Sequence, residues 1–159
     1  MHVTIEYMIL IPALILQIFL FPMFVNVAMG QWTTDRQTLE LQQTASSLSS
    51  LIEQTYLSLN HTSVLSCTFN SALNFPVTIE GYTYTAKATL QAISSTDYGA
   101  SKVLTITMSF EGKNLSTTTE VTLGQNVKWG NSDFTSNPST NYLIAQKFAD
   151  QTIQLSFGS

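Results

Sequence analysis

Residues 7–29 read YMILIPALILQIFLFPMFVNVAM, and this stretch decides the fold. It carries no charge, and its only strongly polar members are Gln17 and Asn26. As an α-helix it would be roughly 35 Å long, enough to cross the hydrocarbon core of a bilayer. It is longer than the apolar core of a secretory signal peptide, and neither a basic region before it nor a small-residue cleavage site after it is present. We therefore expect this apolar helix to belong to the working protein.

Three residues distinguish the expected helix from a plain membrane anchor. Glu6 stands at its start and is the only residue among Asp, Glu, Lys and Arg before Asp35. The Lys and Arg residues that normally orient a membrane helix are missing. Pro12 and Pro22 fall inside the helix, where each removes a backbone hydrogen bond and favours a kink. A simpler interpretation of Glu6 stays open, as an acid at the water interface that is favourable to the helix dipole.

After Gly30 the pattern changes from apolar on all sides to apolar on one side. Trp32 lies at this boundary, as tryptophans often do at a membrane interface. Apolar residues then recur at spacings of three and four, whereas Ser, Thr and Gln fill the other positions. The stripe consists of Leu41, Ala45, Leu48, Ile52, Tyr56 and Leu59. The sequence predicts one helix over residues 4–59, whose second half packs against the rest of the chain.

Beyond Asn60 the period changes to two, which is typical of β-strands. The alternating runs are Tyr82–Leu90, Val103–Phe110, Leu115–Leu123 and Ile153–Phe157, with Val77–Ile79 leading into the first of them. Turns are expected at Glu80-Gly81 and at 111–114, a loop at 94–100, and a turn-rich segment at 124–140. We predict at least four antiparallel strands, in a sheet of five or six.

The predicted fold class is therefore α+β. A long N-terminal hydrophobic helix continues into an amphipathic helix, which is packed by a C-terminal antiparallel β-sheet domain. The expected domains are 1–30 as the assembly or membrane helix, 31–60 as its amphipathic continuation, and 61–159 as a surface-exposed β-domain.

Composition argues against several classes of function. Only 10% of the 159 residues are charged, against roughly 25% in ordinary soluble domains, and the six basic residues are scattered over a chain of net charge −4. Nucleic acid is therefore not an expected partner. The single cysteine, Cys67, cannot form an intrachain disulfide. His61 is six residues from it, but no orienting third group accompanies this pair, so we predict no catalytic, cofactor-binding or metal site and no enzyme.

Two N-glycosylation sequons are present. They are Asn60-His61-Thr62, at the expected end of the helix, and Asn114-Leu115-Ser116, at a predicted turn. Both positions can accommodate a sugar, so Asn60 and Asn114 are candidate modification sites.

The start of the chain carries a family resemblance. Residues 2–10 read HVTIEYMIL and resemble the start of archaeal type IV-like pilins, whose mature chains begin with the form Q-x-S-x-E-x-x-x-L. In this alignment His2 stands for the Gln, Thr4 for the Ser, Glu6 for the Glu and Leu10 for the Leu. The resemblance covers roughly residues 2–30 well and the later architecture loosely.

Pro22 is similar to a proline that many bacterial type IV pilins carry about two-thirds along the buried helix. The family's short leader, with Lys or Arg before the cut, does not precede residue 2. Either the chain is already trimmed or the leader is Met1 alone, which leaves the processing site open.

The resemblance implies a structural subunit of an extracellular pilus with a role in adhesion or surface attachment. It implies assembly through Glu6, Tyr7, Leu10 and Pro22, with other copies of the chain as partners. A prepilin peptidase and the pilus assembly machinery are further partners, and the protein would be membrane-inserted before assembly. Two alternatives stay open. One is a membrane-anchored surface or minor pilin-like protein that does not polymerise and whose β-domain binds a ligand, and the other is an anchored enzyme.

Overall fold

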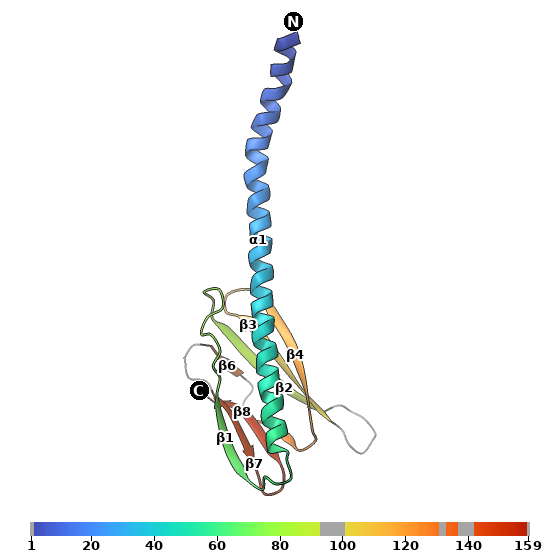
Figure 1. Ribbon diagram of the computed structural model, residues 1–159, viewed down its shortest axis with the longest axis vertical. Helices are drawn as coiled ribbons and strands as arrows, with labels where there is room; N and C mark the ends of the chain where they lie inside the picture. Colours follow the sequence, from blue (N-terminus) through green and yellow to red (C-terminus); the bar gives the residue numbers. More distant parts are fainter. Residues whose placement is uncertain (1, 93–100, 131–132, 137–141, 159) are drawn as a thin grey trace. The chain divides into compact units, whose positions relative to one another are not determined.

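The computed structural model describes residues 2–92, 101–130, 133–136 and 142–158, with the backbone alone at 2–7 and 9. One helix, α1 (His2–Leu59), precedes all the strands (Figure 1). The chain divides into two compact units, Met1–Gln37 and Thr38–Ser159. The second unit therefore contains the amphipathic end of α1 together with the whole β-domain.

Eight strands follow α1 in the described part of the chain. Their bounds are β1 (Cys67–Ala72), β2 (Tyr84–Ala92), β3 (Lys102–Phe110), β4 (Ser116–Leu123), β5 (Val127–Trp129), β6 (Asp133–Thr135), β7 (Tyr142–Lys147) and β8 (Ile153–Gly158). They form two four-stranded sheets, in the orders β1-β7-β8-β5 and β4-β3-β2-β6. Neighbouring strands are antiparallel except β5 and β8, which are parallel.

The predicted α+β class is confirmed, as are the long helix and the strands that became β2, β3, β4 and β8. The prediction of one sheet with five or six strands is wrong, because the strands divide between two sheets. Val77–Ile79 is not a strand: Ile79 makes only an isolated bridge to Tyr82. This bridge closes the expected turn, in which Glu80 and Gly81 have φ values of 51° and 81°. The loop expected at 94–100 lies outside the described residues.

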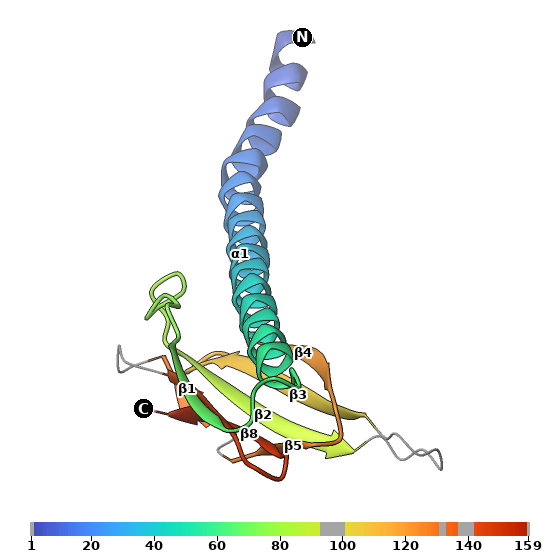
Figure 2. The same cartoon turned by 60° about the horizontal axis from the view of Figure 1, so that its bottom comes forward.

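The predicted apolar stripe of α1 is buried. Leu41, Ala45, Leu48 and Ile52 are at most 1% exposed, and they share one apolar cluster with side chains from both sheets. Figures 1 and 2 show the last turns of α1 lying against the strands. Burial of this stripe and of the facing strand residues stabilises the unit through the hydrophobic effect.

Buried hydroxyls on the same part of α1 have partners within the helix. Thr44, Ser49 and Thr55 each donate a hydrogen bond to the carbonyl oxygen four residues earlier, at 2.9, 3.0 and 2.7 Å. The Ser49 hydroxyl oxygen also lies 3.0 Å from the hydroxyl of Thr119 in β4, from which it can accept a hydrogen bond. These bonds remove the cost of burying a polar group, so a helix rich in Ser and Thr can pack on a sheet.

The end of α1 is held by two polar side chains from the β-domain. Asn126 donates through Nδ2 to the Asn60 side-chain oxygen at 3.1 Å and to the Gln151 carbonyl oxygen at 2.9 Å. Lys147 is only 2% exposed, and its Nζ donates to the His61 carbonyl oxygen at 3.1 Å. A cation just beyond a helix C-terminus interacts favourably with the helix dipole.

The burial of Leu48 generates a stability prediction. Leu48→Asp would place an unpaired carboxylate in the shared core, so we expect a loss of unfolding free energy on the order of 3–5 kcal/mol. The measurement is guanidinium unfolding of the full chain in a mild detergent, followed by near-ultraviolet circular dichroism. Ser47→Asp, at the exposed neighbouring position, is the matched control and should change stability by about 0.5 kcal/mol or less. Equal midpoints for the two variants would contradict the burial of this face.

The buried Tyr84 generates a pH prediction. Its hydroxyl donates to the Pro76 carbonyl oxygen at 2.7 Å, and burial raises the pKa of Tyr84 from 10.0 to about 12. An unfolded tyrosine ionises near pH 10 while the folded one keeps its proton, so this contribution to stability is complete below pH 10 and is lost between pH 10 and 12. Tyr84→Phe should remove that part of the alkaline loss, whereas Tyr142→Phe, at an exposed position, should not. If the wild type and Tyr84→Phe lose the same stability between pH 10 and 12, burial of Tyr84 does not contribute to the alkaline loss.

Candidate assembly surface

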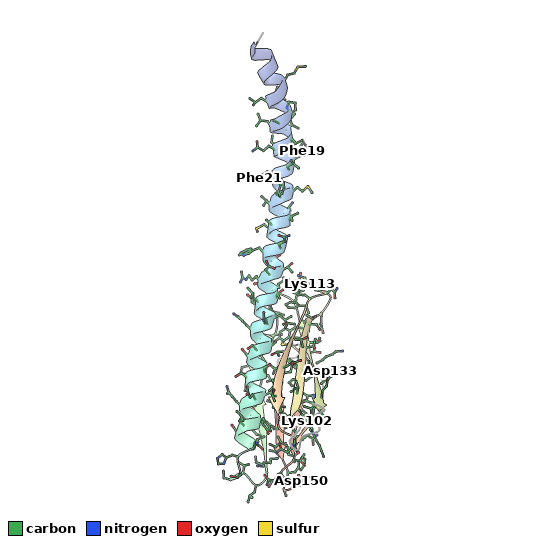
Figure 3. The ribbon with its side chains drawn as sticks, turned by 90° about the vertical axis from the view of Figure 1, so that its right-hand side faces the viewer. Phe19, Phe21, Lys102, Lys113, Asp133 and Asp150 are labelled. Atoms are coloured by element: carbon green, nitrogen blue, oxygen red, sulfur yellow. The ribbon has the colours of Figure 1, made fainter. Side chains whose placement is uncertain are left out.

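The first unit exposes an apolar helix on all its sides. Every side chain of Leu10–Met29 is exposed, including Phe19 at 75% and Phe24 at 71% (Figure 3). Monomeric soluble proteins rarely expose a contiguous apolar surface on this scale. The helix is long and apolar enough to cross a membrane. This segment is therefore compatible with insertion into a membrane.

The structure places only part of the predicted assembly set. Leu10 is 54% exposed, and Pro22 is also exposed, on a helix that continues through both prolines. The backbone is helical at Glu6 and Tyr7, but their side chains lie outside the described residues. Leu10 and Pro22 thus belong to the exposed apolar surface, whereas the role of Glu6 and Tyr7 still depends on the sequence.

A shallow hollow of about 380 Å³ interrupts the apolar surface beside Pro22. Its lining consists of Leu14, Gln17, Ile18, Phe21 and Pro22. Because proline has no N–H, the carbonyl oxygen of Ile18 lacks its usual donor four residues later. The hollow therefore combines apolar walls, the amide of Gln17 and an available backbone acceptor.

The apolar surface ends at Gly30, where side-chain hydroxyls appear. Thr33 and Thr34 both donate to the Gly30 carbonyl oxygen at 2.9 Å, which satisfies the hydroxyls within the helix. Trp32 is 60% exposed just before them. An exposed tryptophan between an apolar and a hydroxyl-rich segment suits a boundary between lipid and water.

The candidate pair His61 and Cys67 lies between the end of α1 and the start of β1. His61 lies in the turn after α1, and its Nδ1 is 2.7 Å from the hydroxyl of Ser63. Cys67 is half-buried at the start of β1. Among the described residues, no group of three or more His, Cys, Asp and Glu side chains is placed to hold a metal ion.

A groove lies between the end of α1 and strand β1 in the second unit. Its volume is about 400 Å³, and its lining consists of Leu51, Gln54, Thr55, Ser58, Leu59, Cys67, Thr68, Phe69 and Ser71. No charged side chain is among them. The groove could not be predicted because β1 was not predicted, and the alternation of Cys67 and Phe69 is a weak signal for a strand.

The polar side chains of this groove are directed back to the helix. Thr55 donates to the Leu51 carbonyl oxygen at 2.7 Å, and Ser58 donates to that of Gln54 at 2.8 Å. Gln54 in turn donates to the Ser50 hydroxyl at 3.1 Å. A specific ligand site presents a few convergent polar groups to its occupant. Here Gln54, Thr55 and Ser58 already donate within the helix, so the α1 side of the groove offers mainly an apolar wall.

Both sequon asparagines are exposed. Asn60 is the first residue after α1, and the atom held by Asn126 is its side-chain oxygen, whereas a sugar would join the nitrogen. Asn114 lies in the turn between β3 and β4, after Gly112, whose φ of 79° fits that turn. Modification at either position is compatible with the fold.

Comparison with known protein families, with curated proteins and with solved structures gave no match. The exposed apolar helix is therefore the feature on which a functional assignment depends.

Proposed function

We propose that this protein is a pilin, the structural subunit of an extracellular type IV-like pilus that polymerises through its N-terminal hydrophobic helix. The observation that carries the proposal is the exposure of every side chain of Leu10–Met29 on a helix whose continuation is buried in its own β-domain. The second half of α1 is buried by strands of its own unit, and we infer that the apolar first half is covered by other copies of the chain.

Assembly would exchange one covering for another. Before assembly the apolar helix lies in the membrane, and in the filament it lies among the same helices of other copies. Because an α-helix satisfies its backbone hydrogen bonds internally, it can move from lipid to protein without unfolding. The β-domains would coat the outside, where they would serve adhesion or surface attachment and could carry sugars at Asn60 and Asn114.

Glu6 is the residue that we assign to subunit register. An unpaired carboxylate in the apolar part of a bilayer costs at least about 2.5–3.5 kcal/mol. The free α-amino group of a neighbouring copy would compensate that charge, and the attraction is much stronger in a low-dielectric bundle than in water. A misplaced subunit would leave both charges unpaired, so the pair would favour the correct axial position. Tyr7, Leu10 and Pro22 would contribute contact surface around it.

A second candidate is a membrane-anchored surface or minor pilin-like protein that never polymerises. The groove between α1 and β1 favours it, because a cavity of about 400 Å³ is in the range of ligand sites. The hydroxyls of Thr55 and Ser58 donate within the helix, which argues against a specific polar ligand there. Electron microscopy of filaments sheared from cells, with side-chain density compared with this sequence, distinguishes the two candidates.

Removal of residues 1–30 tests the role of the apolar helix. We expect the shortened protein to be soluble without detergent and unable to form filaments, because the segment that needs covering is gone. Sedimentation and negative-stain electron microscopy measure both properties. Normal polymerisation of the shortened protein would show that the helix is not the assembly element.

Substitution of Glu6 tests the register. Glu6→Gln keeps size and hydrogen-bonding capacity but removes the charge, so we expect a folded, membrane-inserted protein with sharply reduced filament yield. Glu53→Gln makes the same chemical change at an exposed position of the second unit and should assemble normally. The readouts are filament mass sheared from cells and protein retained in the membrane fraction. Normal yield from Glu6→Gln, or filament density with Glu6 facing water, would return Glu6 to the role of an interface-marking acid.

A further inference from the structure

Gln17 and Asn26 are the two strongly polar side chains of the apolar segment, and both are exposed. They are nine residues apart, because 26 − 17 = 9. Nine residues make about 2.5 turns of an α-helix, so the two amides lie on opposite faces. They are separated by about 13.5 Å along the helix axis.

The two amides cannot pair within one chain. Side chains on a helix meet at spacings of three and four residues, and these two are on opposite sides of the same helix. A buried amide without a hydrogen-bond partner costs free energy in lipid and in a protein bundle alike. Each amide therefore needs a second molecule, and an amide is a suitable partner because it both donates and accepts.

The hollow beside Pro22 can accommodate a side chain of another molecule next to Gln17. Its lining includes Gln17 and Ile18. This face therefore carries two acceptors, the Gln17 side-chain oxygen and the Ile18 carbonyl oxygen, which would normally accept from the N–H that proline lacks at position 22. The Asn26 amide nitrogen carries two hydrogens and can donate to both. Asn26, as a polar side chain on an otherwise apolar face, is complementary to this hollow.

We propose that Gln17 of one copy pairs with Asn26 of a neighbouring copy packed parallel to it, with the Asn26 side chain seated in the hollow beside Pro22. This inference rests on the proposed function, and the partner is a second copy of this chain. The two halves are different residues, so the contact is heterologous. Because each contact also shifts the next copy along the helix axis, the contact repeats without closing into a ring, which is the arrangement of a filament.

The pairing fixes an axial offset of about 13.5 Å between the two copies in contact. Each subunit of a filament has several neighbours, so the Glu6 contact and this one can involve different copies. Glu6 would act at the end of the helix, and the amide pair would act in its middle.

Cross-linking of assembled filaments tests the contact. The full chain with Cys67→Ser, Gln17→Cys and Asn26→Cys is assembled in cells and treated with a short bismaleimide. We expect a ladder of multimers on denaturing gels, because every copy carries both halves of the contact. The variants with Gln17→Cys alone or Asn26→Cys alone should remain monomeric.

Leu16→Cys with Val25→Cys is the matched control, since these exposed residues are also nine apart but are rotated by about 100° around the helix, away from the hollow. We expect no ladder from it. A ladder of equal intensity from this control would overturn the proposal, because cross-linking would then not be specific to positions 17 and 26. Dimers from Gln17→Cys alone would also overturn it, because two Gln17 positions would then be in contact without an axial offset.

An amide exchange separates pairing from mere proximity. Gln17→Leu and Asn26→Leu each leave one amide without its partner, so each should raise the protein concentration needed for assembly roughly three- to twentyfold. The double variant Gln17→Asn with Asn26→Gln keeps both amides and should assemble close to the wild-type concentration. Wild-type assembly by both leucine variants would overturn the pairing.

The outcomes distinguish this inference from the proposed function. Filaments that contain this chain but give no cross-link between positions 17 and 26 would refute the contact and leave the pilin assignment intact. Absence of filaments from cells that display the wild-type protein would refute the assignment itself, and the contact with it.

Discussion

The rest of the structure depends on one constraint: the helix over Leu10–Met29 is apolar on every side, and each of these residues is exposed. In an ordinary globular domain, other helices or strands bury a helix that is apolar on every side. Here the strands are used elsewhere, because they cover the stripe from Leu41 to Leu59 and close a core with it. The chain accordingly divides into two compact units after Gln37, and the apolar helix belongs to the first of them. The second unit has a buried apolar core of its own, and in the proposed filament the first unit would be covered by lipid before assembly and by neighbouring copies afterwards.

The two halves of α1 differ only in their side chains: the second half packs in a protein core, and the first half has an exposed apolar surface. In its second half, Thr44, Ser49 and Thr55 bond to carbonyl oxygens of their own helix, so hydroxyls can lie in the core without cost. In its first half almost all polar groups are absent, so the surface suits any apolar surrounding. A backbone that is internally satisfied throughout permits both, which neither a strand nor a loop would allow.

The helix was predictable to within two residues of each end, because its apolar periodicity is long and changes at one place. Strands β2, β3, β4 and β8 were predictable from alternation. β5 and β6 were not, since each has three residues and is defined by pairing with distant strands rather than by local pattern. β1 is mostly exposed on both faces, so it carries little alternation. Alternation also says which side of a strand is buried but not which sheet it joins, and the division into two sheets could not be read from it.

For the candidate site, sequence and structure contribute different parts. The exposure of Leu10 and Pro22 is observed in the structure, whereas the role proposed for Glu6 is argued from its position in the sequence. A move from lipid into a bundle gains little from apolar area, because lipid chains are as apolar as neighbouring helices. A change of state can be driven only by groups that interact differently with the two states. On this helix those groups are Glu6, Gln17, Asn26 and the carbonyl oxygens opened by the prolines. In the proposed filament each of these groups would gain a partner that lipid does not offer, so the few polar groups, rather than the many apolar ones, would favour association of the helix with other copies of the chain.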